Sequence, residues 1–325
     1  MAIFLAVDVG GSSIKLGLVS ENFELLVEDS FRTQDNQENS DQIVENLTKH
    51  SLDLLSKHDY RKEDLKAIGI GVPGTAINRT GIYEFAGNLP FRRYPLRKKL
   101  TEIFNCPIYL GNDANFAGLA ESRLGAGQGA ENSVTLTLGT GMGAGVVIND
   151  RVYLGFNEAA SEFGHTVMEI DGIPCTCGRN GCFESYVSAT ALIRQTKEAI
   201  AENPDSILAI TANAEGKVSG RTSFNAWRND CPVGTKVVKT YAKYLAIGIA
   251  NVINSYMPDV VIIGGGISNE GQCLVDLCED EAIKQSFLHG EVAIPKIVIA
   301  TLGNKAGTLG AALFADDCLK DGLIY

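Results

Sequence analysis

Short apolar runs alternate along this 325-residue chain with longer segments in which apolar residues recur every three or four positions. The short runs predict buried strands, and the longer periodic segments predict amphipathic helices. Runs of the first kind lie at residues 3–7, 16–19, 23–27, 67–72, 107–110, 133–138, 145–148, 260–263 and 296–300.

The helical period is clearest in residues 41–57 and 235–256. Further helices are expected at 114–124, near 270–286 and around 306–316. Strands that alternate with helices indicate an α/β fold. The apolar faces consist of Ile43, Val44, Leu47, Leu54 and Leu55 in the first segment, and of Val237, Val238, Tyr241, Leu245, Ile249 and Val252 in the second.

Two glycine-rich segments resemble each other, AVDVGGSSIKLGLV at residues 6–19 and TLTLGTGMGAGVVI at 135–148. Each predicts a strand, a tight turn and a second strand. A chain that opens each half with the same hairpin suggests two similar folding units facing one another, although two glycine-rich hairpins also resemble each other by chance. No linker rich in proline or serine separates the halves, so the pattern alone sets the boundary.

The composition excludes several classes of partner. Hydrophobic residues make up 45% of the chain and charged residues 21%, which is typical of a soluble globular protein. The net charge of −11 argues against nucleic acid or an anionic membrane as a general partner, because both require a basic face. One local basic cluster is interpreted as a solvated loop and helix surface: Arg92, Arg93, Arg97, Lys98 and Lys99.

Neither a membrane span nor a secretion signal is expected. No apolar stretch reaches the ~18–20 residues that cross a bilayer. The first residues lack the positive region of a signal peptide and reach Asp8 before an apolar core could form. We therefore expect a cytoplasmic protein in which the eight cysteines are not a disulfide framework.

Three glycine clusters are candidate phosphate or nucleotide sites, since glycine lets backbone N–H groups approach an anion closely. In the first, Asp8 stands at a strand end, where a carboxylate can hold Mg²⁺ through water. None matches a Walker A or dinucleotide motif, and each alone could be a plain turn. Together they favour nucleotide binding. The candidate residues are Asp8, Gly10, Gly11, Ser12, Ser13 and Lys15, then Gly139, Thr140, Gly141 and Gly143, and finally Gly264, Gly265 and Gly266.

Asp113 lies between a predicted strand and a predicted helix, with Asn112 and Asn115 beside it. One interpretation is a helix N-cap, a position that aspartate fills well. The other is a general base that accepts the proton of a sugar hydroxyl during attack on phosphorus. Spacing alone does not separate the two.

Four candidate metal ligands, His165, Cys175, Cys177 and Cys182, fall close together, with glycines and a proline between them. These ligand types and turns favour a tetrahedral Zn²⁺, which would be structural because protein fills all four positions. A disulfide and unrelated packed thiols are the alternatives. The other cysteines, expected to pack as small hydrophobes, are Cys106, Cys231, Cys273, Cys278 and Cys318.

Glu162 and Glu184 flank the metal cluster, and His165 follows Glu162 by three residues. Carboxylates are natural acceptors for sugar hydroxyls. Ordinary surface glutamates are the alternative for both positions.

Together these motifs resemble the ROK family of bacterial sugar kinases, named for repressors, open reading frames and kinases, over essentially the whole chain. The motifs are the phosphate loop at 8–15, Gly-Asn-Asp-Ala-Asn at 111–115, Leu-Gly-Thr-Gly-Met-Gly at 138–143, Glu-Phe-Gly-His at 162–165 and Cys-x-Cys-Gly-x-x-Gly-Cys-x-Glu at 175–184. The last two of these motifs, which are joined by His-x₉-Cys, are highly specific.

The resemblance implies an actin-like (ribonuclease H-like) ATPase fold of two α/β domains with a cleft between them. A smaller domain would comprise residues 1–112 and about 305–325, and a larger one residues 113–304 with the zinc-binding loop at 165–182. Asp113 would be the base, and His165 would offer one ring nitrogen to zinc and the other to the sugar. The implied sugar contacts are Asn88, Asn112, Asp113, Glu162, His165 and Glu184.

Within the family, the glucokinases resemble the chain most closely, through Gly-Val-Pro-Gly-Thr at 71–75 and Gly-Asn-Leu-Pro at 87–90. We therefore expect transfer of the γ-phosphate of ATP-Mg²⁺ to a hexose, glucose first, with adenosine near residues 264–266. Fructose, N-acetylglucosamine and N-acetylmannosamine remain alternatives, and the family suggests a homodimer.

A sugar-sensing regulator without catalysis is the alternative from another class. The repressors of the family carry an N-terminal winged helix ahead of the kinase-like part. Asp8 lies too near the start of this sequence to leave room for one, and the acidic net charge and Asp113 also favour the kinase.

Overall fold

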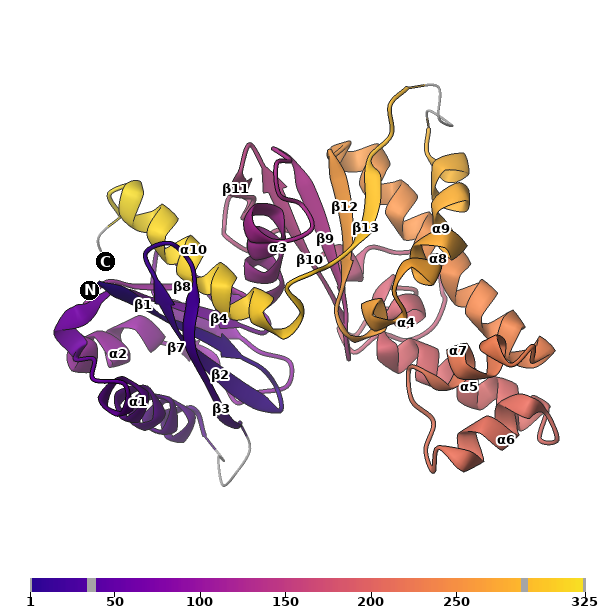
Figure 1. Ribbon diagram of the computed structural model, residues 1–325, viewed down its shortest axis with the longest axis horizontal. Coiled ribbons are helices and arrows are strands. Elements are labelled where there is room, and N and C mark those ends of the chain that lie inside the picture. The colour runs from indigo at the N-terminus through magenta and orange to yellow at the C-terminus, as the bar shows by residue number, and fades with distance from the viewer. Residues whose placement is uncertain (1, 34–38, 288–291, 324–325) are drawn as a thin grey trace. The chain divides into compact units, whose positions relative to one another are not determined.

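The computed structural model describes residues 2–33, 39–287 and 292–323, and it has a mixed α/β architecture (Figure 1). The chain divides into two compact units. Unit 1 comprises Met1–Leu124, Gly145–Ser161 and Asn304–Tyr325, and unit 2 comprises Gly125–Ala144 and Glu162–Gly303. In the described residues no helix is long and apolar enough to cross a membrane.

A five-stranded sheet forms the centre of unit 1, in the order β3-β2-β1-β4-β8. Strands β1, β2 and β3 are antiparallel neighbours, whereas β1, β4 and β8 run parallel. Parallel strands end at the same edge of a sheet, so the ends of β1, β4 and β8 lie side by side. The strands are β1 (Ile3–Val9), β2 (Ser13–Ser20), β3 (Leu25–Arg32), β4 (Leu65–Val72) and β8 (Ile108–Asn112).

Helices cover both faces of this sheet because successive strand residues point to opposite sides. On one face, the predicted apolar stripe of α1 (Ser40–Lys57) is buried in a cluster with Leu5, Val7 and Leu16, which confirms that helix. On the other face lies α10 (Ala306–Lys320), where Gly69 of β4 meets the backbone of Ala311. Unit 1 also contains η1 (Lys62–Asp64), α2 (Leu96–Phe104), α3 (Asp113–Leu124), η4 (Gly303–Lys305) at its boundary, and a small sheet of β5 (Thr75–Ile77), β6 (Ile82–Phe85) and β7 (Arg92–Tyr94).

Helix α3 packs closely along α10. A Cβ atom added at Gly310 would lie 1.8 Å from the carbonyl oxygen of Phe116, and the rings of Phe116 and Phe314 are 4.8 Å apart. The expected domain limits placed α3 in the second domain with residues 113–304. The structure instead groups α3 and residues 145–161 with unit 1, because α3 buries its apolar side against α10.

A second five-stranded sheet has the order β11-β10-β9-β12-β13, and the chain passes from unit 2 to unit 1 along β10. Its order matches that of the first sheet strand for strand, with β9 and β10 in the places of β1 and β2. This match confirms the repeated folding pattern inferred from the two glycine-rich hairpins. The strands are β9 (Ser133–Leu138), β10 (Met142–Ile148), β11 (Arg151–Val152), β12 (Val260–Gly264) and β13 (Lys296–Ile299).

The helices of unit 2 gather around α8 (Pro232–Tyr256), whose predicted apolar face is buried. This helix begins three residues before the predicted start, since proline is well tolerated in a first turn. The others are η2 (Phe163–His165), α4 (Glu184–Val187), α5 (Ala189–Glu202), α6 (Ile207–Ala214), α7 (Thr222–Arg228), η3 (Gly266–Glu270) and α9 (Gln272–Gln285).

The third predicted strand is misplaced. It was expected at residues 23–27 but runs over Leu25–Arg32, because Phe23 occupies a turn with φ 61°. Strand β3 alternates half-buried and exposed residues along its length. A run of apolar residues therefore marks its start and misses its polar remainder.

Candidate functional site

The ends of β1, β4 and β8 bring two predicted acidic residues to one edge of the sheet in unit 1. Asp8 pairs with Gly71 of β4, and Gly71 pairs with Gly111 of β8. Two strand spacings of roughly 4.8 Å therefore separate Asp8 from the residues just before Asp113. Asp8 and Asp113 therefore follow the same edge of the sheet, two strands apart.

Asn112, and not Asp113, caps helix α3. The Asn112 Oδ1 atom accepts hydrogen bonds from the N–H groups of Ala114 (2.9 Å) and Asn115 (3.1 Å), and its Nδ2 atom donates to the carbonyl of Gly74 (3.0 Å). The N-cap interpretation of Asp113 is thus wrong. Asn112 uses both ends of its amide to fix the residue that follows it.

Asp113 is the first residue of α3, half-buried, and its Oδ1 atom accepts the N–H of Ala114 at 2.9 Å. A negative side chain is favourable there because the first turn of a helix carries a partial positive charge. Burial and the Asp113 carboxylate together raise the pKa of Tyr83, whose hydroxyl donates to the carbonyl of Pro73. Tyr83 is a neighbour of Asp113 that the sequence analysis missed.

The loop between β1 and β2 is tightly constrained. The Gly10 N–H bonds to the Ser13 carbonyl at 2.9 Å, and the Thr33 hydroxyl bonds to the Gly10 carbonyl at 2.7 Å. A Cβ at Gly11 would lie 2.3 Å from the Asn88 side-chain nitrogen. The predicted sugar contact Asn88 and the predicted phosphate loop are therefore adjacent within unit 1.

Lys15 lies across the hairpin from Asp8. Its ammonium group is 3.5 Å from the Asp8 carboxylate and donates to the carbonyl of Asn304 at 3.1 Å. Burial raises the pKa of Asp8, while Lys15 opposes that shift. The start of α10 closes over the same carboxylate, since a Cβ at Gly307 would lie 2.7 Å from Asp8 Oδ2. Asp8 offers one carboxylate on the hairpin that also contains the hydroxyl-bearing Ser12 and Ser13, which suits Mg²⁺, a cation that takes few protein carboxylates.

In unit 2, two predicted glycine clusters follow parallel neighbouring strands. Strand β9 leads into the loop at residues 139–141, and β12 leads into Gly265 and Gly266. Gly265 has φ 80°, and a Cβ there would lie 2.5 Å from the backbone nitrogen of Leu138. The two clusters therefore share one edge of the second sheet, and only glycine permits their contact at position 265.

Glu162, His165 and Glu184 also come together in unit 2. Burial raises the pKa of Glu162, the positive potential of His165 lowers it, and the Glu184 carboxylate raises it further. The Cys175 sulfur lies 3.7 Å from both His165 Nδ1 and Glu184 Oε1, so these two side chains are close together, and both influence the pKa of Glu162. Carboxylates and an imidazole in one place provide acceptors and a donor for a polyhydroxylated ligand.

The four predicted metal ligands converge. Their ligand atoms all lie within 4.8 Å of one another. The Cys177 and Cys182 sulfurs are 3.6 Å apart, and the Cys175 sulfur is 3.7 Å from His165 Nδ1. Ligands held at the usual Zn–S distance in a tetrahedron stand about 3.8 Å apart, so the spacing fits zinc. With Nδ1 turned to the cysteines, Nε2 is the ring nitrogen left for another partner.

A short hairpin brings these ligands together. An isolated bridge pairs Val167 with Cys182, and a second pairs Pro174 with Asn180. The turn between the cysteines is closed by a hydrogen bond of 3.0 Å from the Gly178 N–H to the Cys175 carbonyl, with Gly178 at φ 89°. The chain thus folds His165 back onto the cysteine turn. The five remaining cysteines are free, and Cys231, Cys278 and Cys318 are buried.

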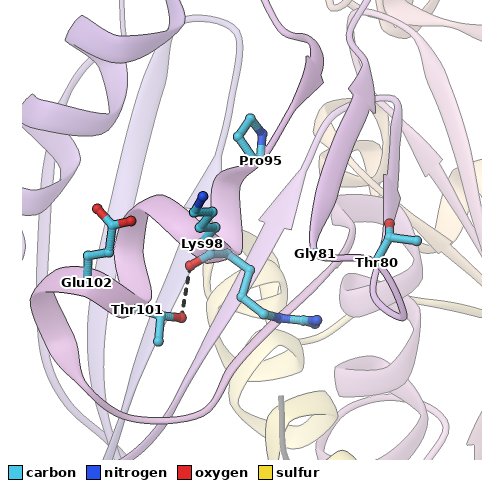
Figure 2. Close-up of a pocket in the computed structure, with 7 residues that line it drawn as sticks. Thr80, Gly81, Pro95, Lys98, Thr101 and Glu102 are labelled. Carbon is cyan, nitrogen blue, oxygen red and sulfur yellow. Dashed lines mark hydrogen bonds between the residues drawn. The ribbon is translucent and has the colours of Figure 1, made fainter.

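A cavity of about 340 Å³ lies elsewhere in unit 1, beside the start of α2 (Figure 2). The solvated interpretation of the basic cluster is wrong for Arg97, which is buried and donates to the carbonyls of Ile108 (2.7 Å) and Asn78 (2.5 Å). No predicted site residue lines this cavity, so we assign it no substrate. Its lining comprises Thr80, Gly81, Pro95, Arg97, Lys98, Thr101 and Glu102.

Comparison with known proteins agrees with the motifs. A family model described as the ROK family matches residues 4–318. A glucokinase of Halalkalibacterium halodurans is 37% identical, over 94% of this chain and 93% of that protein. A ROK family glucokinase from Streptomyces griseus, solved with glucose and AMPPNP, has a TM-score of 0.83 at 30% identity, over 97% of this chain and all of that one. A ROK family transcriptional regulator, a homolog of the E. coli MLC protein, has a TM-score of 0.86 at 26% identity and is covered over 79% of its length.

The capping geometry makes a testable distinction between two adjacent residues. Asn112→Ala should lower the free energy of unfolding by about 1–2 kcal/mol, because it removes the cap and the bond to Gly74. Asp113→Asn should cost less than about 1 kcal/mol, since only the favourable charge at the helix start is lost. Urea unfolding measures both. If both variants lowered the free energy of unfolding equally, Asp113 would contribute to the helix cap as much as Asn112 does.

Proposed function

The chain belongs to the ROK family, and we propose that it is an ATP-dependent hexokinase whose first substrate is glucose, giving glucose 6-phosphate and ADP. Relatives named glucokinase support this, one of them at 37% identity over nearly the whole chain. The related structure with glucose and AMPPNP supports both the sugar and the nucleotide.

One observation carries the proposal: Asp113 stands at a strand end as the first residue of α3, while Asn112 does the capping. The fold thus fixes the position of a carboxylate that the helix does not require as its cap. Asp8 lies at the same sheet edge, two strands away. A base and an acidic residue suited to Mg²⁺ in this arrangement match what phosphoryl transfer requires.

In the proposed reaction, a carboxylate oxygen of Asp113 accepts the proton of the C6 hydroxyl of glucose. The C6 oxygen forms a bond to the γ-phosphorus as the bond from that phosphorus to the β–γ bridging oxygen breaks, and ADP leaves with the bonding electrons. Backbone N–H groups of Gly11 and Ser12 in the first loop, and of Thr140 and Gly141 in the second, bind the phosphates. Mg²⁺, held near Asp8, neutralises phosphate charge when bound.

The residues proposed to contact the sugar are Asn88, Asp113, Glu162, His165 and Glu184. Because the polar atoms of Asn112 are bonded to Gly74 and to the start of α3, this residue serves mainly to hold Asp113. Adenosine is proposed near Gly264, Gly265 and Gly266.

We further propose that His165, Cys175, Cys177 and Cys182 bind one structural Zn²⁺. The support is the mutual distance of the ligand atoms and the hairpin that presents them. Zinc held by His165 Nδ1 would fix the orientation of the imidazole and leave Nε2 for the sugar, and it would tie the His165 ring to the cysteine turn.

Fructose, N-acetylglucosamine and N-acetylmannosamine stay alternative sugars, and a homodimer and a cytoplasmic location stay predictions. A non-catalytic regulator is the rival function. The similarity to a ROK family transcriptional regulator supports it, but a regulator does not require a carboxylate at position 113 that the helix cap at Asn112 leaves in place.

Replacement of Asp113 by Asn tests the mechanism. The variant keeps the shape of the side chain and loses the proton acceptor, so kcat with glucose should fall ~10²–10⁴-fold. Glucose binding, measured by calorimetry, should change far less. Asp53→Asn, which removes an exposed carboxylate from α1, is the matched control and should retain full activity. A variant at position 113 that keeps more than about a third of the wild-type rate would refute the assignment of the base.

Metal content tests the zinc proposal. Elemental analysis of the purified protein should find about one zinc per chain, and Cys177→Ala should lose it, because three ligands bind zinc far less tightly. Cys273→Ala removes a cysteine outside the cluster and should leave the zinc content unchanged. Wild-type protein without zinc, or a Cys177 variant that retains it, would contradict the proposal.

A further inference from the structure

The loop at residues 139–143 of unit 2 is held by a second segment, which begins at Glu162 and ends at Thr190. That second segment contains all four predicted zinc ligands. The two are far apart in sequence, yet at least four contacts join them. We call residues 139–143 the nucleotide loop and residues 162–190 the ligand segment.

Glu184 makes the first contact. Its Oε2 atom accepts the N–H of Met142 at 2.8 Å, and a Cβ at Gly141 would lie 2.5 Å from the same oxygen. Its other oxygen lies 3.7 Å from the Cys175 sulfur and 3.5 Å from the Thr176 hydroxyl. One carboxylate therefore touches the nucleotide loop on one side and the cysteine turn on the other.

The start of α5 makes two more contacts. The N–H of Ala189 donates to the Gly139 carbonyl at 2.8 Å, and the Thr190 hydroxyl donates to the Thr140 carbonyl at 2.8 Å. The Ser188 side chain caps the helix and so fixes the position of both donors. At the other end of the ligand segment, a Cβ at Gly164 would lie 2.2 Å from the Met142 carbonyl oxygen, which places His165 next to a residue in contact with the loop.

These contacts decide which way the loop amides point. In a trans peptide unit the C=O and N–H bonds point in opposite directions. The carbonyls of Gly139 and Thr140 are turned toward α5, so the N–H groups of Thr140 and Gly141, which share those peptide units, are turned away from it. Two successive N–H groups on one side form a concave site for an anion.

We propose that the ligand segment sets the shape of the nucleotide loop, with Thr190 as a positioning residue, so that metal binding and nucleotide binding are coupled. The inference rests on the proposed function for the identity of the nucleotide. Glu184 extends the coupling, since the carboxylate assigned to the sugar also holds an N–H of the loop. Loss of the metal should loosen the cysteine turn and, through Glu184 and α5, the nucleotide loop.

Thr190→Val removes the hydroxyl and keeps the branched shape. Because one hydrogen bond is lost, the Kd for MgADP, measured by calorimetry, should rise roughly two- to tenfold, and the KM for ATP should rise similarly. Zinc content and the KM for glucose should stay at wild-type values. Thr190→Ser, which keeps the hydroxyl, should restore nucleotide binding, an outcome that a purely structural role of the methyl group would not give.

Thr211→Val is the matched control, because the Thr211 hydroxyl makes the same kind of bond to a carbonyl, that of Ile207, within α6. It should leave every value unchanged. An unaltered Kd for MgADP in Thr190→Val, or failure of Thr190→Ser to restore it, would overturn the role of Thr190.

A second experiment tests the effect of zinc. It compares zinc-loaded protein with protein from which a chelator has removed the zinc and with the Cys177→Ser variant. Hydrogen–deuterium exchange of a peptide covering residues 139–143 should become at least about tenfold faster without zinc, because the Met142 amide loses its fixed acceptor. Binding of MgADP should weaken in parallel. Unchanged exchange and unchanged MgADP binding after metal removal would overturn the coupling.

The exchange measurement separates this inference from the proposed function. Protein that fails to phosphorylate any hexose, yet shows zinc-dependent exchange in residues 139–143, would refute the kinase and keep the coupling. An active kinase in which neither zinc removal nor Thr190→Val changes exchange or nucleotide binding in the nucleotide loop would refute the coupling and keep the kinase.

Discussion

The parallel pairing of β1, β4 and β8 constrains everything proposed for unit 1. Strands in parallel register end at one edge, so the main-chain hydrogen bonds of the sheet bring together Asp8, the Pro73-Gly74 turn and the Asn112-Asp113 pair. The hydrogen bond from Asn112 to the Gly74 carbonyl adds to this pairing. Small residues then allow close packing. A Cβ at Gly71 would touch the Phe116 ring at 3.0 Å and lie 3.5 Å from the Asp113 Cα. The site therefore has the rigidity of the sheet and of the α3–α10 pair beneath it.

The candidate sugar residues of unit 2 are held in place by different interactions. They come from an irregular segment with few regular hydrogen bonds, which sheet pairing does not hold in place. A metal would suit that position, because the four candidate ligands lie close enough together for one ion to fix all of their side chains. Glu169 adds an anchor, since it accepts hydrogen bonds from Tyr186 and Tyr244, the latter on α8. Gly181, at φ 76°, lies so close to the Glu169 carbonyl that no other residue fits there.

The sequence predicts the features that depend on local pattern. Strand β9 and the apolar faces of α1 and α8 have the predicted residues, because burial imposes a period that a single segment displays. The small sheet β5-β6-β7 was missed, since its strands are three or four residues long and β7 consists of Arg92, Arg93 and Tyr94. Strands this short contain too few residues to show an alternation.

Contacts between distant segments account for most of what the sequence could not give at the site. The motifs single out Asp8, Asp113 and the four candidate metal ligands, but they do not show that Lys15 bonds to the carbonyl of Asn304, which follows it by 289 positions. Thr190 has no motif around it, and its role depends on where α5 begins relative to the nucleotide loop. Asn112 and Asp113 are equally good caps by residue type, and only the backbone geometry decides between them.

The central claim, that this chain transfers phosphate to a hexose, is tested most directly by a hexose panel. Zinc-loaded protein with ATP-Mg²⁺ is mixed in turn with glucose, fructose, N-acetylglucosamine and N-acetylmannosamine, and ADP and the phosphorylated sugar are both quantified, the latter by ³¹P NMR. We expect ADP formation that requires a hexose, an equal amount of sugar phosphate, and the highest kcat/KM for glucose with phosphate on O6. Protein that binds a hexose in this panel and forms no sugar phosphate would contradict the kinase and favour a sugar-sensing regulator.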